Sequence, residues 1–265
     1  TALRIAAMQD VPVVYTYHTR YDFYGRYILT QSNTLSLALR NLSRGYCRLC
    51  NAVIAPSESI ARILQDEGAS ALVRVIPTGI DIGAFEGGNG PLFRSEAGIP
   101  PSAFLVGHVG RLSEEKNLLF LTDAFVDFLL HNAGAHVVIG GGGNLKVELE
   151  RRFKEAKLMD RVHFSGVVTG QKLANFYAAL DVFGFASFSE TQGLVLQEAM
   201  ATGRPVIALD SPGVREVVSD HITGRLQPAA ATPQEFSHAL SEFAHLPDDV
   251  RRKMQDDAKA TAKTF

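Results

Sequence analysis

Cysteine, charge of one sign and long apolar runs are all scarce in this sequence, and each absence excludes a class of protein. Its 265 residues contain two cysteines, too few for a disulfide-stapled secreted scaffold, which favours a cytoplasmic location. The formal net charge is −2 at pH 7, so an overall basic surface for nucleic acid is absent. No apolar run approaches the roughly 18 residues that span a membrane, and Arg4 and Gln9 interrupt the first apolar stretch too early for a signal peptide.

The two cysteines, Cys47 and Cys50, form a single C-x-x-C pair. A structural zinc site uses four ligands, and a second pair is missing from the sequence. A redox C-x-x-C usually begins a helix after a strand, whereas this pair comes late in a predicted helix, with both residues on one face. We therefore interpret both cysteines as small buried apolar residues.

The sequence does contain a regular alternation of short apolar runs and amphipathic stretches over nearly its whole length. The runs are rich in Val and Ile at successive positions, which is typical of strands buried on both faces. Helical patterns lie between them, such as 57–68, where Ser57 is a candidate N-cap and Gly68 follows the last turn. This alternation predicts an α/β fold with doubly wound parallel sheets. The predicted strands are 11–17, 52–56, 72–77, 104–110, 135–140, 161–166, 181–186, 204–209 and 224–227.

Residues 78–103 break this rhythm, with several glycines and prolines and no clear periodicity. We interpret 83–102 as a linker between two domains. Residues 103–265 then form a complete C-terminal Rossmann-like domain with six strands. Residues 1–82 hold only three predicted strands, so we expect them to be the back part of a truncated N-terminal Rossmann-like domain.

Two cations mark the end of one predicted strand. In open α/β sheets, ligands bind beyond the carboxyl ends of the strands. Arg111 and Lys116 follow the strand 104–110 and precede a helix, a setting that suits a diphosphate. The alternative is a surface loop in which Arg111 pairs with Glu114 or Glu115.

A glycine cluster at 140–143 follows the next predicted strand. It does not match the dinucleotide-binding fingerprint, because the last position of that motif is Leu145 and no acidic residue follows at the required distance. We expect these glycines to allow close backbone packing rather than to form a dinucleotide site.

The segment after the predicted strand 181–186 gives the strongest functional signal. Residues 191–194 begin a predicted helix, whose N-terminal N–H groups can hold a phosphate. Glu190 can accept hydrogen bonds from sugar hydroxyls, and Glu198 can hold a vicinal diol. Phosphates flanked by hydroxyl groups indicate a sugar nucleotide. The alternative is that Glu190 caps the helix and that Glu198 is solvated.

Glu190 and Glu198 form an E-x7-E motif within FASFSETQGLVLQEAMATGRPVIALDSPGVREVV. This segment resembles the donor-binding segment of retaining GT-B fold glycosyltransferases of the glycogen-synthase-like and phosphatidylinositol-mannosyltransferase-like group. VIAPSES, VIPTGID, GHVGRLSEEKN and VHFSGVV resemble the same family in the same order, so the resemblance covers nearly the whole chain. It implies transfer of a hexose from a nucleotide-diphosphate sugar such as UDP-glucose to an acceptor hydroxyl, with retention of configuration.

The resemblance also implies roles for the matching residues. Arg111 and Lys116 would hold the donor diphosphate and stabilise it as it leaves. Glu190 would lie near the donor hexose, Glu198 would hold the ribose diol, and His18 would reach toward the donor sugar. The donor-binding loops would contribute Val168 at the nucleobase, and Thr191, Gln192, Gly193 and Leu194 at the hexose and phosphate.

The resemblance implies no cofactor and no required metal ion, because the D-x-D triplet of the metal-dependent glycosyltransferase architecture is missing from the sequence. Aromatic and cationic residues gather at 20–27, in a run similar to bacterial diacylglycerol glucosyltransferases, which suits a lipid headgroup. We therefore expect a lipid or small glycoside acceptor, peripheral contact with the inner face of a membrane, and no nucleic-acid partner. The alternative for 20–27 is the start of an amphipathic helix packed on the first sheet.

Two further functions stay open at this level. A sugar-nucleotide epimerase shares the two-domain architecture, although the SETQGLVLQEA run favours a transferase. The second open function is a nucleotide-sugar-binding module without catalysis. The expected truncation would remove the front part of the N-terminal domain, which carries much of the acceptor site in the family that the sequence resembles.

Overall fold

The chain is described by a computed structural model that covers residues 2–20, 33–69 and 71–265. It divides into two compact units, which are treated separately below. The first comprises the residues up to Thr78 together with Ser189–Gln192, and the second comprises Gly79–Phe188 and Gly193–Phe265.

The first unit is built on a three-stranded parallel sheet with the order β1-β2-β3. Val14 is paired with Ala52, and Ala52 in turn with Leu72. The elements along the chain are α1 (Ala2–Gln9), β1 (Val14–Thr16), α3 (Asn33–Leu49), β2 (Ala52–Ala55), α4 (Glu58–Asp66) and β3 (Leu72–Val75). All three strands predicted in this part of the sequence are therefore present.

Helix α3 brings both cysteines into the core of this unit. Cys47 and Cys50 are buried and unbridged, and they pack with Val53, Ile60 and Leu64. Burial raises the pKa of the Cys47 thiol to about 11, so it stays protonated near neutral pH. The interpretation of the pair as buried apolar residues is confirmed.

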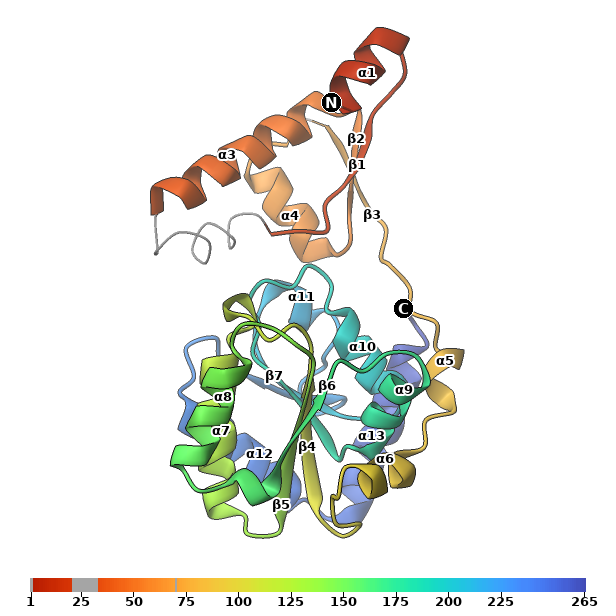
Figure 1. Cartoon of the computed structure of the whole chain (residues 1–265). Coiled ribbons are helices and arrows are strands. Elements are labelled where there is room, and N and C mark those ends of the chain that lie inside the picture. The colour runs from red at the N-terminus through yellow and green to blue at the C-terminus, as the bar shows by residue number, and fades with distance from the viewer. Residues whose placement is uncertain (1, 21–32, 70) are drawn as a thin grey trace. The chain divides into compact units, whose positions relative to one another are not determined.

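The second unit is a six-stranded, entirely parallel sheet with the order β6-β5-β4-β7-β8-β9 (Figure 1). Its strands are β4 (Phe104–Val109), β5 (Ala135–Gly140), β6 (Val162–Gly166), β7 (Val182–Phe185), β8 (Val206–Leu209) and β9 (Gly224–Gln227). Each coincides with a predicted strand. The doubly wound parallel arrangement predicted from the sequence is confirmed.

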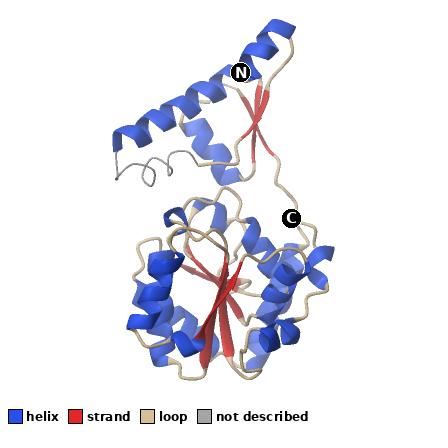
Figure 2. Ribbon diagram, viewed as in Figure 1, coloured by secondary structure: helices blue, strands red, loops and turns tan. Residues whose placement is uncertain are grey.

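Helices cover both faces of this sheet (Figure 2). One face carries α7 (Leu118–His131), α8 (Lys146–Glu155) and α12 (Pro233–Ala244). The other carries α5 (Gly83–Glu86), α6 (Gly90–Glu96), α9 (Gln171–Ala179), α10 (Leu194–Ala201) and α13 (Asp248–Ala262). Short turns of helix complete the unit: η1 (Glu114–Lys116), η2 (Met159–Arg161) and α11 (Pro212–Arg215).

Successive strand residues enter opposite cores, which explains the continuous apolar runs. Leu105 packs in the core beneath α9 and α10, whereas Val106 packs in the core beneath α7 and α12. Both side chains are fully buried. A strand covered on both faces needs apolar residues at every position, so its sequence lacks the alternation of a half-exposed strand.

The structure differs from the expected linker at 83–102. Helices α5 and α6 form there and pack against α9 in the second unit. Gly90 is required at the contact, because a Cβ atom on it would lie 2.3 Å from the Ala178 carbonyl oxygen. Glycines that suggest a flexible connection therefore serve close helix packing, a distinction that composition does not reveal.

The two helices after Pro228, α12 and α13, close the second unit. Thr232 and Glu235 make a reciprocal capping box at the start of α12, and α13 packs on α10. Within residues 2–20, 33–69 and 71–265, no helix combines the length and apolar character needed to cross a lipid bilayer.

Candidate functional site

The topological switch point of the second unit lies between β4 and β7, which are neighbours in the sheet. From β4 the chain proceeds to β5 and β6 on one side, and from β7 it proceeds to β8 and β9 on the other. In open parallel sheets a ligand crevice forms beyond the carboxyl ends of such a pair. The loops that leave β4 and β7 therefore define the candidate site of this unit.

Hydrogen bonds join these two loops at their base. Asn117 Nδ2 donates to the Ala186 carbonyl oxygen at 3.2 Å, and Ser187 Oγ donates to the Glu115 carbonyl oxygen at 3.3 Å. Ser211 Oγ also donates to the Ser187 carbonyl oxygen at 3.3 Å. The loop after β4 is thus fixed against the start of the loop after β7 before any ligand binds.

Arg111 and Lys116 both lie in the loop after β4, as the sequence predicted. The Arg111 side chain is 66% exposed, and its Nη1 lies 3.6 Å from Glu115 Oε1. The alternative pairing with Glu115 is therefore present in the structure. Exposed ion pairs of this kind contribute little to stability, so an anionic ligand can compete for the guanidinium group.

Helix α10 begins directly after the loop that follows β7. Its N-cap residue, Gly193, has φ +74° and, being a glycine, has no side chain of its own to cap the first turn. The alternative role of Glu190 as a helix cap stays open beside its predicted place near the hexose. The N–H groups at Leu194 and its neighbours stand at the positive end of the helix dipole, where an anion is favoured.

Glu198 lies on the same face of α10 as Leu194, four residues further along. It is half-buried, and Tyr177 Oη donates a hydrogen bond to its Oε2 at 2.7 Å. Burial raises the pKa of the Glu198 carboxyl, and the hydrogen bond from Tyr177 opposes that rise. The alternative of a solvated Glu198 is wrong, since this carboxylate is held in a largely apolar setting.

Hydrogen bonds between side chains and the backbone hold Thr191 and Gln192 within the first unit. Thr191 Oγ1 donates to the His18 carbonyl oxygen at 3.2 Å, and Ser57 Oγ donates to the Thr191 carbonyl oxygen at 2.7 Å. Gln192 Nε2 donates to the Thr78 carbonyl oxygen at 2.6 Å, and Gln192 Oε1 accepts from the Thr78 N–H at 2.8 Å. Spacing along the sequence does not identify Ser57 or Thr78 as partners, because they lie more than a hundred residues away.

His18 and Glu190 also belong to the first unit. The His18 side chain is exposed beyond the end of β1, and Glu190 is half-buried. The structure places the His18 backbone against Thr191, as described, and the role of the imidazole stays a prediction. The predicted lipid-contact run extends through residues 21–27, which lie outside the described residues.

Val168 follows β6, the edge strand two positions from β4. It lines a hollow of about 350 Å³ together with Phe164, Ser165 and Lys172. Within the described part of the chain, the buried Ser165 hydroxyl has no hydrogen-bond partner. The loop after β6 begins at the same edge of the sheet as the loops after β4 and β7. The role of Val168 at the nucleobase stays a prediction.

His108 is a polar residue beside the site that the sequence analysis missed. It lies near the end of β4, fully buried against Phe183 and Phe185. Its Nδ1 lies 3.0 Å from the Gly184 carbonyl oxygen and so carries the proton, while Nε2 has no partner among the described residues. A histidine inside the otherwise apolar run FLVGHVG was the available signal.

Burial lowers the pKa of His108 from 6.5 to about 4, and this predicts acid sensitivity. The neutral form stabilises the fold fully above about pH 6.5, and this stabilisation is lost as the pH falls toward 4, because the unfolded chain binds the proton first. The free energy of unfolding should fall by about 3 kcal/mol from this group over that range. The half-buried His136 and His163, whose pKa values are also lowered, act in the same direction.

Chemical denaturation at several pH values tests this prediction. His108→Phe should flatten the slope between about pH 6.5 and 4, whereas replacement of the exposed His238 by Gln should leave it unchanged. An unchanged slope in His108→Phe would show that His108 does not govern acid stability.

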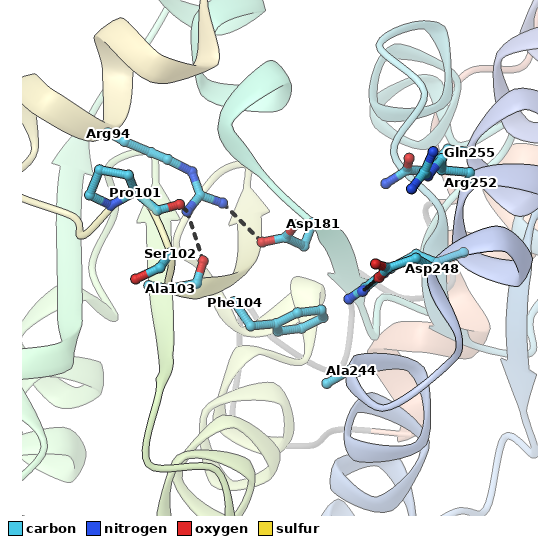
Figure 3. Close-up of a pocket in the computed structure, with 11 residues that line it drawn as sticks. Arg94, Pro101, Ser102, Ala103, Phe104, Asp181, Ala244, Asp248, Arg252 and Gln255 are labelled. Atoms are coloured by element: carbon cyan, nitrogen blue, oxygen red, sulfur yellow. Dashed lines mark hydrogen bonds and ion pairs between the residues drawn. The ribbon is translucent and has the colours of Figure 1, made fainter.

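A second hollow, of about 500 Å³, lies at the opposite, amino-terminal edge of the same sheet (Figure 3). There Arg94 donates to Asp181 Oδ2 at 2.9 Å and to the Ala103 carbonyl oxygen at 2.7 Å, and Leu105 N donates to the same Asp181 oxygen. These bonds fasten α6 to β4 and β7. Of the described residues that line this hollow, none is a predicted site residue, so we assign it a structural role.

Comparison with known proteins agrees with this fold and with the motifs at the strand ends. Residues 91–261 match the family described as Glycosyl transferases group 1, and residues 1–83 match Glycosyltransferase Family 4. The chain is 33% identical, over 90% of its length, to the alpha-monoglucosyldiacylglycerol synthase of Streptococcus pneumoniae, and it spans 58% of that protein. It is also 33% identical, over 84% of its length, to the sulfoquinovosyl transferase SQD2 of Arabidopsis thaliana, of which it spans 43%.

Solved structures show the same fold at lower sequence identity. Anabaena Alr3699/HepE in complex with UDP and glucose superimposes with a TM-score of 0.83 at 23% identity, over 99% of this chain and 70% of that one. The parallel sheets are those of the GT-B architecture that the sequence motifs predicted. The chain therefore belongs to the glycosyl transferases group 1 family.

Proposed function

We propose that this chain carries the donor site of a glycosyltransferase that moves a hexose from a nucleotide-diphosphate sugar to an acceptor hydroxyl, with retention of configuration. One observation carries the proposal. The switch point of the second unit combines two cations after β4, the N-terminus of α10 after β7, and the half-buried carboxylate of Glu198. Cations and helix amides suit phosphates, and a carboxylate suits a sugar diol.

The proposed chemistry follows from these charges. As the bond between the hexose and the diphosphate breaks, negative charge grows on the leaving oxygen. Arg111, Lys116 and the N-terminus of α10 would stabilise that charge, and positive groups fixed in advance do so at little reorganisation cost. They also supply the neutralisation that a divalent metal supplies elsewhere, so the proposal requires no metal ion and no cofactor.

The remaining site residues have proposed positions around the sugar. Glu190 would lie near the hexose, and His18 would contact the donor sugar. Backbone groups of 191–194 would contact the hexose and the phosphate, and Val168 would line the nucleobase. A front-face reaction, in which the acceptor attacks from the side that the diphosphate leaves, gives retention without a covalent intermediate.

A lipid is the proposed acceptor. The names of two relatives, a monoglucosyldiacylglycerol synthase and a sulfoquinovosyl transferase, support a glycolipid pathway. The mixture of aromatic and cationic residues at 20–27 suits a headgroup layer, which would place the enzyme at the cytoplasmic face of a membrane.

A stereochemical assay tests this function. The chain, and a version extended at its N-terminus from the parent gene, are incubated with UDP-glucose and vesicles that contain diacylglycerol or its monoglucoside. We expect an α-linked product from the α-linked donor, read by proton NMR. A β-linked product would contradict retention, an isomerised donor would indicate an epimerase, and binding without transfer in both versions would indicate a binding module.

Glu198 provides a sharper prediction about donor recognition. The unaltered chain should bind UDP at least about tenfold more tightly than 2′,3′-dideoxy-UDP, because the ribose diol donates hydrogen bonds to the half-buried Glu198 carboxylate. Glu198→Ala should abolish this preference, as measured by calorimetry, while Glu150→Ala at a partly exposed position of α8 should keep it. A variant that still prefers ribose as strongly as the parent would remove Glu198 from the ribose site.

A further inference from the structure

We propose that Tyr177 is a positioning residue for donor recognition: its hydroxyl holds one oxygen of Glu198, so that the other oxygen is left to accept hydrogen bonds from the ribose diol. The inference rests on the proposed function and adds to it a residue on a different helix, α9. Tyr177 would not touch the donor itself and would act through Glu198.

The contact between the two side chains is short and shielded from water. Tyr177 Oη lies 2.7 Å from Glu198 Oε2. The Tyr177 ring is fully buried and makes edge contacts with Phe85 and Phe176, each at 5.9 Å between centroids, and a tilted contact with Phe183 at 5.7 Å. Because three neighbouring rings fix the phenol, the position of its hydroxyl, and with it that of Glu198 Oε2, is defined before the donor arrives.

The second carboxylate oxygen is left for a ligand. Within the described residues, Glu198 makes its one hydrogen bond to Tyr177 and none through Oε1. An ionised carboxylate has about four acceptor positions, so Glu198 keeps unused capacity. It also shares a helix face with Leu194, at the end of α10 where the phosphate is proposed to bind, and in a nucleotide the ribose is joined directly to that phosphate.

The hydrogen bond also bears on the charge of Glu198. Burial raises the pKa of Glu198, and the Tyr177 hydrogen bond lowers it. No charged group on the described parts of α5, α9, α13 or β8, which pack against α10, adds to this balance. Burial together with the neighbouring carboxylate raises the pKa of Tyr177 well above its usual value, so its hydroxyl remains a donor throughout the neutral range.

Removal of this hydroxyl should therefore weaken donor binding in a way that depends on pH. Tyr177→Phe keeps the ring and its packing, but it leaves the Glu198 carboxylate less stabilised and shifts its pKa upward. By calorimetry, the preference for UDP over 2′,3′-dideoxy-UDP should fall about tenfold near neutral pH, the factor that 1.4 kcal/mol represents. The loss should be larger at lower pH than at higher pH, because the Glu198 carboxyl of the variant is ionised less readily without the Tyr177 hydrogen bond.

A double-mutant cycle separates positioning from general damage. If Tyr177 acts through Glu198, then Tyr177→Phe should cost no further ribose preference in a Glu198→Gln background. Tyr46→Phe in α3 is the matched control and should change nothing. Unaltered ribose preference and pH profile in Tyr177→Phe, or an equal loss in both backgrounds, would overturn the inference.

The failure of this inference is distinguishable from failure of the proposed function. If the unaltered chain shows no ribose preference, the donor site itself is wrong and the inference falls with it. If Tyr177→Phe does not fold, 3,5-difluorotyrosine at position 177 keeps the ring and makes the hydroxyl a stronger donor. Ribose preference should then persist to lower pH than in the unaltered chain, and an unchanged pH profile would contradict the role of Tyr177.

Discussion

Replacement of both Arg111 and Lys116 by alanine is expected to weaken the binding of a nucleoside diphosphate by about 3–6 kcal/mol, a loss of at least a hundredfold. The estimate takes about 1.5–3 kcal/mol for each hydrogen bond to a charged group. Arg111 is largely exposed in the loop after β4 and forms an ion pair with Glu115 of the same loop, so the fold should not depend on it. Isothermal calorimetry with UDP measures the loss, and thermal unfolding should show little change.

A matched control distinguishes a specific site from overall charge. Arg151 and Lys154 lie on the exposed face of α8, and their double alanine variant removes the same two charges from the second unit. This control should bind UDP as the parent does. Equal affinity of the Arg111/Lys116 double variant and the parent would show that the diphosphate does not bind at this loop.

Gly141→Ala is expected to destabilise the second unit by about 4 kcal/mol, from backbone strain and overpacking together. Gly141 has φ +124°, and a Cβ atom on it would lie 1.8 Å from the Gly110 carbonyl oxygen. Alanine would therefore force the loop after β5 away from the loop after β4, which carries Arg111. Urea unfolding should show the loss of stability, and calorimetry should show weaker UDP binding.

The neighbouring glycine gives the control. Gly142 lies outside the left-handed region, and its nearest contact from a Cβ atom would be 3.3 Å, to Val167 Cγ2 at the end of a movable side chain. Gly142→Ala should cost less than about 1 kcal/mol. If the two variants are equally stable, the close approach of the two loops is not a determinant of this fold.

Some features of the fold follow directly from the sequence because they depend on local pattern. Strands buried on both faces require continuous apolar runs, and β4 and β8 are found where such runs occur. The cap at Ser57 is equally local, because its side chain accepts from the Ile60 N–H three residues away. The segment at 83–102 misled the same reasoning, since glycines serve both flexible connections and tight helix contacts such as that of Gly90 with Ala178.

The candidate site was predictable in residue type and position, but not in its partners. Arg111, Glu198 and the start of α10 could be located because the ends of parallel strands share one edge of the sheet. The hydrogen bond from Tyr177 to Glu198 joins two helices, and the unpaired nitrogen of His108 arises from packing against β7. Such contacts depend on how elements meet in space, and spacing along the sequence carries no signal for them.

The most direct test of the donor site is a titration of the isotopically labelled chain with UDP-glucose, followed through its backbone amide signals. We predict that the largest shifts fall on 111–117 and 193–198, on both sides of the switch point between β4 and β7, with smaller shifts at Val168. Shifts concentrated instead at the amino-terminal edge, around Arg94 and Arg252, or no shifts at millimolar donor, would contradict the proposed location of the site.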